Sequence, residues 1–410
     1  MYVNDSLKFV INGRFSNELW LTQGVKQGED KIRNITNNHG PFIGCNLSPL
    51  LFSLFISQLG PELNSSGLGI DLGDLNVSSL FFADDIVLIA KNKKSLDILM
   101  SKTRNFFKSH RLTISETKSK IMTHDSFSGK TSFNDSANYQ PITLDNVVAF
   151  KYLGIHVSSS PYSLFKDYNT NVKTKAQRYL TSVLSISKTG PDRSEMAYMT
   201  WSRIALPSIL YGSEVMPLTQ DTINIIEKYQ SQIAKFMLQI PRSSASVSTH
   251  LDAGFPPVWS IIAQKVMLYA SSTMRKPDTN WAKIALKEQV SQGYKCPYSR
   301  YLLKWKAATN CFGVTPKQIQ TSVTNAATTW VLSEQKQTCV TTFAMNGPDQ
   351  YKNWFKPKGW VNDSSTSRLI ARFRACNTQL GNRGPARNGQ YYKLCPLCSK
   401  AGIAALNNEV

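Results

Sequence analysis

The chain has few acidic residues and no long apolar run. Its 410 residues include 27 Asp and Glu against 47 Lys and Arg, which gives a formal net charge of +20. This excess favours a polyanionic partner, because lysine and arginine gain affinity when phosphates release their counterions. No apolar stretch approaches the ~18 residues of a membrane span, and neither a signal peptide nor a basic amphipathic helix with a clear apolar face is present. We therefore expect nucleic acid as the partner and no membrane association.

Cysteine is also scarce. The seven cysteines are an odd number scattered over a long chain, which does not suggest a disulfide framework and favours an intracellular, reducing compartment. With 41% hydrophobic residues, the chain can bury a substantial core and is expected to divide into two or three domains.

Two adjacent carboxylates, Asp84 and Asp85, stand between two short apolar runs. The runs 79–82 and 86–89 are rich in Phe, Ile, Val and Leu, so they predict two strands with the acids at the turn. Ionised carboxylates beside a buried sheet are costly and repel each other unless a cation compensates them. Mg²⁺, which prefers oxygen ligands, suits such a pair. The alternative is an exposed Asp-Asp turn, because Asp is a common turn former.

Further motifs surround this hairpin in a defined order. Upstream come Gly24-Val25-Lys26-Gln27-Gly28 and the segment 45–56, which contains Ser48-Pro49. Downstream come the segment 112–122 around Lys118 and the run Phe150-Lys151-Tyr152-Leu153-Gly154-Ile155. This succession resembles the reverse transcriptases of non-LTR (LINE-like) retrotransposons, whose palm carries the same motifs in the same order. Each motif is weak alone, but the four in register are specific.

The resemblance implies an α+β fold. It consists of an incomplete polymerase palm with a small antiparallel sheet in residues 1–157, a helical thumb in 158–275 and a mostly helical, basic C-terminal region in 276–410. The activity implied is RNA-directed DNA polymerisation, with Mg²⁺ as cofactor and with an RNA template and a DNA primer or target as partners.

The resemblance also assigns roles residue by residue. They are metal binding and catalysis for Asp84 and Asp85, phosphate neutralisation for Lys118, template or nucleotide contact for Gln27, Gly28, Ser48 and Pro49, and primer grip for Phe150, Tyr152, Leu153 and Gly154.

Several of these residues predict local structure independently of the family. Gly24 and Gly28 free the backbone for a turn or for close approach to a ligand. Ser48 and Pro49 predict a helix start, with Ser as N-cap and Pro at the first position, and the apolar residues that follow keep helical spacing: Leu50, Leu51, Leu54, Phe55 and Leu59. Lys118 is predicted in a strand or turn, where a solvated surface lysine is the alternative. The run 150–154 is also compatible with an ordinary core strand.

Two features depart from the family pattern. A two-metal polymerase needs a further aspartate on an upstream strand, yet the only acids before Gly24 are Asp5 and Glu18, and Asp5 lies in a polar run with the character of a turn. We expect that the chain begins after that strand and that the fingers are missing as well. Residues 29–44 are the second departure. Removing them would join Gly28 to Cys45 in an uninterrupted family match, so we interpret them as an insertion.

The remainder of the chain is predicted to be helical and basic. Apolar residues recur at helical spacing through 172–184 with Lys173, Lys175 and Arg178 between them, which suits either a helix along a phosphate backbone or a solvated charged face. Residues 204–211 and 223–238 predict two more helices. Tryptophans after 276 lie among basic residues and could stack bases, although core packing is the more common role.

The C-terminal end adds a basic segment and a cysteine pair. No acidic residue occurs between Asp363 and Glu409, and this favours a nucleic-acid contact over a merely solvated tail. Cys395 and Cys398 form a Cys-x-x-Cys knuckle with two of the four ligands that zinc needs, and no His or Cys follows them. We expect no stable zinc binding there.

The sequence therefore predicts a fragment of a retrotransposon reverse transcriptase with little or no polymerase activity on its own, because the first catalytic aspartate is missing. The alternatives are a non-catalytic nucleic-acid-binding remnant and a degenerate fragment that does not fold. The metal-site hypothesis requires Asp84 and Asp85 to lie near the Gln27 loop and beside a concave surface.

Overall fold

The computed structural model describes the strand segments 5–7, 10–11, 14–15 and 19–21. From 48 to 335 it describes all residues except 74, 111, 116, 124–136, 140–141, 190–192, 241, 243–248, 251–252 and 312–314. Gln27, Gly28, the 29–44 segment, Cys395 and Cys398 lie outside the described residues. The chain divides into two compact units, residues 1–150 with 279–288 and residues 151–278 with 289–410.

In its described residues, the first unit is an α+β unit of short strands and helices. Its strands are β1 Asp5–Leu7, β2 Val10–Ile11, β3 Arg14–Phe15, β4 Leu19–Leu21, β5 Ile70–Leu72, β6 Leu75–Val77, β7 Ser79–Phe82, β8 Asp85–Leu88, β9 Lys120–Ile121, β10 Ala137–Tyr139 and β11 Ile142–Asn146. Its helices are α1 Ser48–Ile56, α2 Leu59–Asn64 and α3 Lys93–Ser109. The α+β class expected from the sequence is confirmed.

The strands pair in small groups. Antiparallel pairs are β1 with β4, β2 with β3, β5 with β6, β7 with β8 and β10 with β11, whereas β9 lies parallel to β11. Asp5 differs from its predicted place in a turn, because it opens β1 opposite Leu21 of β4. Backbone pairing thus overrides a polar local composition, as is common for short strands.

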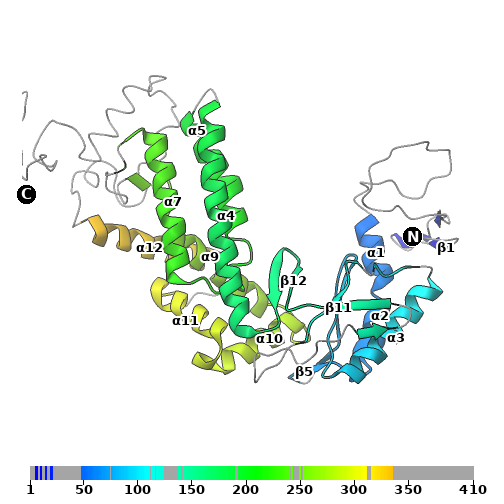
Figure 1. Ribbon diagram of the computed structural model, residues 1–410. Helices are drawn as coiled ribbons and strands as arrows, with labels where there is room; N and C mark the ends of the chain where they lie inside the picture. The colour runs from blue at the N-terminus through cyan, green and yellow to red at the C-terminus, as the bar shows by residue number, and fades with distance from the viewer. Residues whose placement is uncertain are drawn as a thin grey trace, which may run out of the picture. The chain divides into compact units, whose positions relative to one another are not determined.

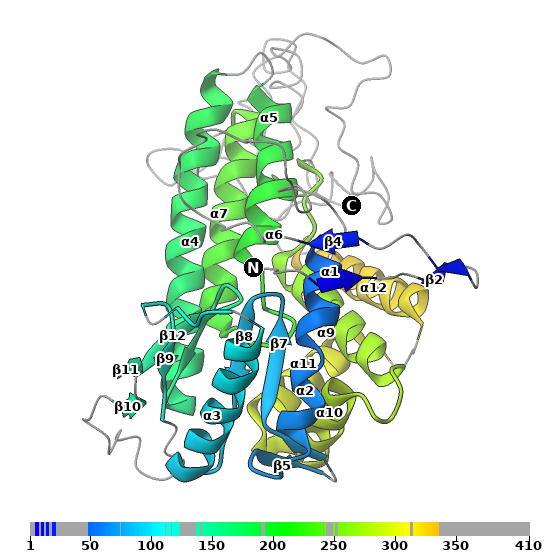
Figure 2. The same cartoon turned by 90° about the vertical axis from the view of Figure 1, so that its right-hand side faces the viewer.

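The core of the first unit forms where α2 and α3 pack beside the β7–β8 hairpin (Figure 2). Leu59 and Leu63 of α2 and Leu99 of α3 are fully buried, and Phe81 and Leu88 of the hairpin pack against them. Burying side chains of this size stabilises the unit by about 1.5–3 kcal/mol each. The hairpin is therefore held on its apolar face by two helices.

The predicted helix after Ser48 begins where expected but is interrupted. It ends at Ile56, and α2 begins at Leu59, so Leu59 is buried in the second helix while Leu54 of the first is 58% exposed. Pro61 explains the interruption, because its ring clashes with the carbonyl four residues earlier and it has no N–H to donate.

The second unit is built mainly from helices. Strand β12 (Ala149–Tyr152) crosses the boundary between the units, and β13 (Ile155–Ser158) lies in the second. The elements that follow are α4 Pro161–Thr189, α5 Arg193–Met199, the π-helix η1 Thr200–Ala205, α6 Leu206–Ile209, α7 Gln220–Leu238, α9 Val258–Met274, the 3₁₀ turn η2 Gly293–Lys295, α11 Pro297–Thr309 and α12 Pro316–Gln335. Helix α10 (Trp281–Ser291) starts in the first unit and ends in the second. Helices α4 and α7 run side by side (Figure 1).

The helical periodicity of the second unit is confirmed. Val172, Ala176, Leu180 and Val183 of α4 are buried at the predicted spacing, and α7 contains the predicted 223–238 helix. The predicted 204–211 helix is instead a π-helix followed by a short α-helix. Pro207 accounts for this, because it cannot donate the hydrogen bond that a continuous α-helix needs at that position. Among the residues described, no helix is both long and apolar enough to cross a membrane.

Candidate functional site

The two acids lie at the tip of the predicted hairpin. Strands β7 and β8 pair from Ser79 with Leu88 to Phe82 with Asp85, which leaves Ala83 and Asp84 as a two-residue turn. Ala83 has a φ of 51°, in the left-handed region that a side chain disfavours by roughly 1 kcal/mol or more. Two-residue hairpin turns require positive φ at their first central position, so the tight turn imposes this strain.

Asp84 and Asp85 are exposed at this tip. Within the described residues no hydrogen bond or ion pair engages either carboxylate, in contrast to Asp71 of β5, whose pKa is lowered by the hydrogen bond that Lys91 donates at 2.6 Å. Mg²⁺ keeps several waters and is often bound through one or two carboxylates, so the pair fits one hydrated ion. The described residues contain no group of three or more His, Cys, Asp or Glu placed to hold a metal.

Asn64 at the end of α2 positions the hairpin, and sequence analysis missed it. Its Oδ1 accepts hydrogen bonds from the backbone N–H groups of Ser78 at 2.9 Å and Ser79 at 3.1 Å, and both serines are fully buried. The Ser78 hydroxyl donates to the Leu63 carbonyl at 2.6 Å. One amide oxygen thus satisfies the two donors at the start of β7, where an unpaired buried N–H would cost about 1–3 kcal/mol. No local pattern signals this role, because the two segments are far apart in sequence.

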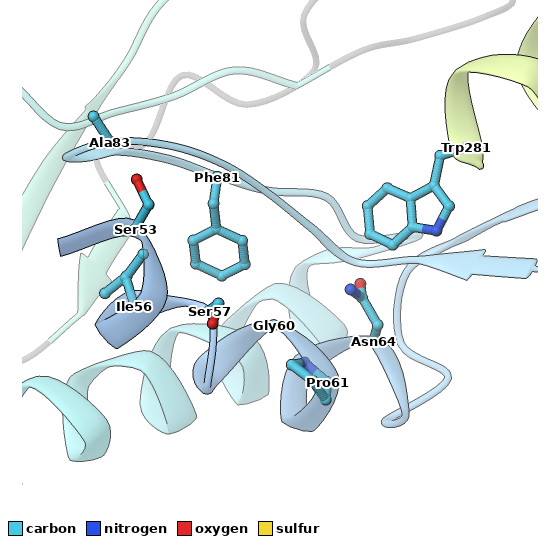
Figure 3. A pocket seen from close by; sticks show the side chains of 9 residues that line it. All are labelled: Ser53, Ile56, Ser57, Gly60, Pro61, Asn64, Phe81, Ala83 and Trp281. Carbon is cyan, nitrogen blue, oxygen red and sulfur yellow. The ribbon is translucent and has the colours of Figure 1, made fainter. Parts of the chain in front are cut away.

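A pocket of about 540 Å³ lies beside the hairpin. Ser53 of α1, Ser57 of the turn after α1 and Asn64 of α2 line it. Phe81 and Ala83 line it from the hairpin, and the Trp281 ring points toward it (Figure 3). Gly60 also lines it, and a Cβ there would come within 3.3 Å of the Phe81 ring, so glycine permits the close approach of α2. Ala83, which precedes Asp84, lines this pocket, whereas Asp84 and Asp85 are not among its lining residues, so the metal site stays a prediction.

Lys118 lies in an exposed turn before β9. Its neighbour Lys120 donates to Asp145 Oδ2 of β11 at 2.6 Å, opposite it in the parallel ladder. The predicted strand or turn is confirmed as a turn, and its phosphate role stays a prediction.

The predicted primer-grip residues form a second strained hairpin. Phe150 and Tyr152 lie in β12, and Leu153 and Gly154 form the turn to β13 with φ values of 46° and 82°. Positive φ at both turn positions is typical of a two-residue hairpin. Phe150 is 37% exposed, and Tyr152 and Leu153 are half-buried.

Tyr211 anchors this turn and was not predicted from the sequence. Its hydroxyl donates to the Leu153 carbonyl at 2.9 Å, and its own carbonyl accepts from the Tyr168 hydroxyl of α4 at 2.9 Å. A Cβ at Gly154 would lie 3.3 Å from the Tyr211 ring. The turn is thereby connected to α4 through Tyr211 and Tyr168.

Two of the three basic residues predicted for a phosphate-facing helix are engaged within the protein. Lys173 pairs with Asp221 of α7, and Lys175 donates to the Ser208 carbonyl at 2.6 Å. Arg178 is exposed. The basic face of α4 is therefore partly a structural contact between helices, which the periodicity alone could not distinguish from a nucleic-acid surface.

Comparison with known proteins agrees with the motif order. Residues 7–157 match the family described as reverse transcriptase (RNA-dependent DNA polymerase). Over these residues the chain is similar to reverse transcriptases. A 211-residue stretch is 26% identical to a retrovirus-related Pol polyprotein from type-1 retrotransposable element R2 of Popillia japonica, and it covers 50% of this chain and 30% of that relative.

A second R2 Pol polyprotein of the same organism is 24% identical over 223 residues, with 53% of this chain and 28% of the relative covered. The chain thus spans less than a third of the length of these curated relatives. The reverse transcriptase match includes the hairpin with Asp84 and Asp85, Lys118 and the run 150–154, and it ends at residue 157.

Proposed function

We propose that the first unit is the metal-binding palm portion of an RNA-directed DNA polymerase that copies retrotransposon RNA. The family match over 7–157 together with two exposed carboxylates on a strained hairpin supports this proposal. Asp84 and Asp85 would hold Mg²⁺, which when bound activates a primer 3′ hydroxyl and stabilises departing pyrophosphate. Other hypothesised contacts are Gln27, Gly28, Ser48 and Pro49 for template and nucleotide and Lys118 for phosphate.

The protein's own residues would supply orientation in this site. Asn64 fixes the start of β7, and packing of Phe81 against α2 fixes the hairpin face, so the two carboxylates project from a rigid element. The turn at Leu153 and Gly154, held by Tyr211, would position a primer strand in the same way. For this chain alone we propose little or no polymerisation, because one hairpin supplies fewer carboxylate oxygens than two metal ions need.

Metal binding at the hairpin can be tested with Mn²⁺ as the probe. Electron paramagnetic resonance of free Mn²⁺ should reveal a site that Asp84→Asn weakens at least tenfold. Asp97→Asn on α3 makes the same charge change at an exposed position and is the matched control. Equal binding by wild type, Asp84→Asn and Asp97→Asn would exclude the hairpin as the metal site.

Polymerase activity is tested by primer extension on an RNA template with Mg²⁺ or Mn²⁺. We expect at most trace product from this chain. Abundant product that disappears in Asp84→Asn would overturn the proposed inactivity while supporting the site itself.

The second candidate function is nucleic-acid binding without catalysis. The net charge of +20 and exposed cations such as Arg178, Arg300 and Lys304 support it. Binding of RNA that falls steeply with salt and that is unchanged by Asp84→Asn would favour this function, since phosphate contacts depend on counterion release.

A further inference from the structure

Three tryptophans of the second unit line a cleft that the proposed polymerase chemistry does not use. Trp259 of α9, Trp305 of α11 and Trp330 of α12 meet around about 820 Å³, together with Gln220, Asn310 and Asn325. Cavities of roughly 300–1,000 Å³ with aromatic walls and a few polar groups are the usual form of ligand sites. We call this site the tryptophan cleft.

Two of the aromatic rings are stacked, and the third stands edge-on to one of them. Trp259 and Trp305 lie nearly parallel, with ring planes 7° apart and centroids 6.4 Å apart. Trp330 stands edge-on to Trp259 at 78° and 6.2 Å. Trp305 is only 3% exposed and so belongs to the core, whereas Trp259 and Trp330 remain half-exposed. Core packing therefore explains one ring, and it leaves two ring surfaces open to the cleft.

Polar groups in the cleft match a heteroaromatic ligand. Asn310 and Asn325 bring exposed amides, which both donate and accept hydrogen bonds. An apolar lipid tail over Asn310 and Asn325 would leave their amides unsatisfied, whereas the edge of a nucleobase offers both donors and acceptors.

The charge around the cleft selects an anionic ligand. None of the described residues that line it is acidic. Lys304 contacts two residues that line it, because its ammonium lies 4.6 Å from the centroid of the Trp305 ring and donates to Gln220 Oε1 at 3.1 Å. Arg300 is exposed one turn earlier on the same helix. A cationic ligand such as a quaternary ammonium would meet these cations without a compensating carboxylate, whereas a phosphate would gain from them.

We propose that the tryptophan cleft binds an unpaired base of a single-stranded nucleic acid, with the base against Trp259 and Trp330 and a phosphate near Lys304. This proposal rests on the proposed function only because it takes nucleic acid as the partner. Base stacking on aromatic side chains is sequence-tolerant. The cleft is therefore expected to hold a strand regardless of its sequence.

The test measures the affinity of the full chain for two single-stranded DNA oligonucleotides by fluorescence anisotropy. One is an intact strand of about 12 nucleotides, and the other is the same strand without bases in its central part. EDTA is present, so the result does not depend on the metal site. Wild type should bind the intact strand roughly 5- to 150-fold more tightly. Trp330→Leu should abolish most of this preference, and Trp330→Phe should keep most of it. Thr324→Ala, an exposed change elsewhere on α12, should leave it unchanged.

Lys304→Gln separates the phosphate contact from stacking. It should reduce the salt slope of binding by about one ion while keeping the preference for the intact strand. Urea midpoints equal to wild type establish that the variants fold. Equal wild-type binding of both strands, as expected if another segment of the chain fills the cleft, would overturn the proposal. So would an undiminished preference in Trp330→Leu.

Discussion

Gly212 should be sensitive to substitution for two separable reasons. It lies in the buried connection after α6 with a φ of 82°, where a side chain is strained by about 1–2 kcal/mol. A Cβ there would also lie 2.9 Å from Ile155 Cδ1 and 3.6 Å from the Tyr168 ring. Overpacking typically costs about 1–3 kcal/mol, and the lower end applies because Cδ1 is the mobile end of its side chain. Gly212→Ala should therefore lower the free energy of unfolding by about 2–3 kcal/mol.

Two further variants separate the backbone part of this loss of stability from the steric part. Gly293 also has a positive φ, but a Cβ at that residue would meet nothing within 4 Å, so Gly293→Ala should cost only the backbone part, about 1–2 kcal/mol. Ile155→Val removes Cδ1, so the double variant with Gly212→Ala should be about 1 kcal/mol more stable than the sum of the single changes predicts.

The measurement is urea unfolding followed by tryptophan fluorescence. A loss below about 0.5 kcal/mol in Gly212→Ala would refute the strain argument, because that is the scatter of ordinary surface changes. Strict additivity with Ile155→Val would refute the steric part alone. Either outcome would mean that the β12–β13 hairpin is held less closely than Ile155 and Gly212 indicate.

Three other predictions concern stability. Gly69→Ala should destabilise the first unit by more than about 3 kcal/mol in urea unfolding, since its Cβ would lie 2.1 Å from the Val77 carbonyl oxygen, which is backbone; a variant as stable as wild type would contradict this contact. Asn64→Leu should lower the free energy of unfolding by about 2–5 kcal/mol in the same assay, and it should weaken Mn²⁺ binding because it releases the hairpin. An unchanged free energy of unfolding together with unchanged Mn²⁺ binding would exclude the positioning role of Asn64. Burial raises the pKa of Tyr298 and Tyr301 above the usual value near 10. Above this pH the two tyrosines lose their protons in the unfolded state but keep them in the folded state. The free energy of unfolding should therefore be unaffected below about pH 10 and fall above it by about 1.4 kcal/mol per pH unit per tyrosine. Tyr298→Phe should reduce that slope, and stability independent of pH up to about 11 would contradict the burial effect.

Local patterns predicted the elements whose signals are local. Alternating apolar runs around Asp84 and Asp85 indicated the β7–β8 hairpin, Ser48 marked the start of α1, and the apolar period through 172–184 indicated α4. The sequence analysis missed the interruptions of the predicted helices at Pro61 and Pro207, where a proline lies among apolar residues with helical spacing. Periodicity detects which face is apolar, but it does not register a missing backbone donor.

Contacts between distant segments were beyond sequence reasoning. Asn64 satisfies two backbone donors fourteen and fifteen residues away, and Lys173 pairs with Asp221 forty-eight residues away. Such partners are chosen by packing, because the buried donors must be satisfied once the helices have docked. The same holds for the tryptophan cleft, whose three rings come from three helices.

Backbone strain links the two hairpins of the reverse transcriptase match. Ala83 and Leu153 are non-glycine residues with positive φ, and each occupies the turn of a two-residue hairpin where glycine would cost less. Stability alone therefore does not account for the side chains at these turns. Residues held in disfavoured conformations gather at functional sites, where the surrounding structure enforces them. Asn64 and Tyr211 are the enforcing partners here, since one fixes the strand that leads to Ala83 and the other holds the Leu153 carbonyl in place. This pairing of a strained turn with a remote anchor supports a positional role for both hairpins.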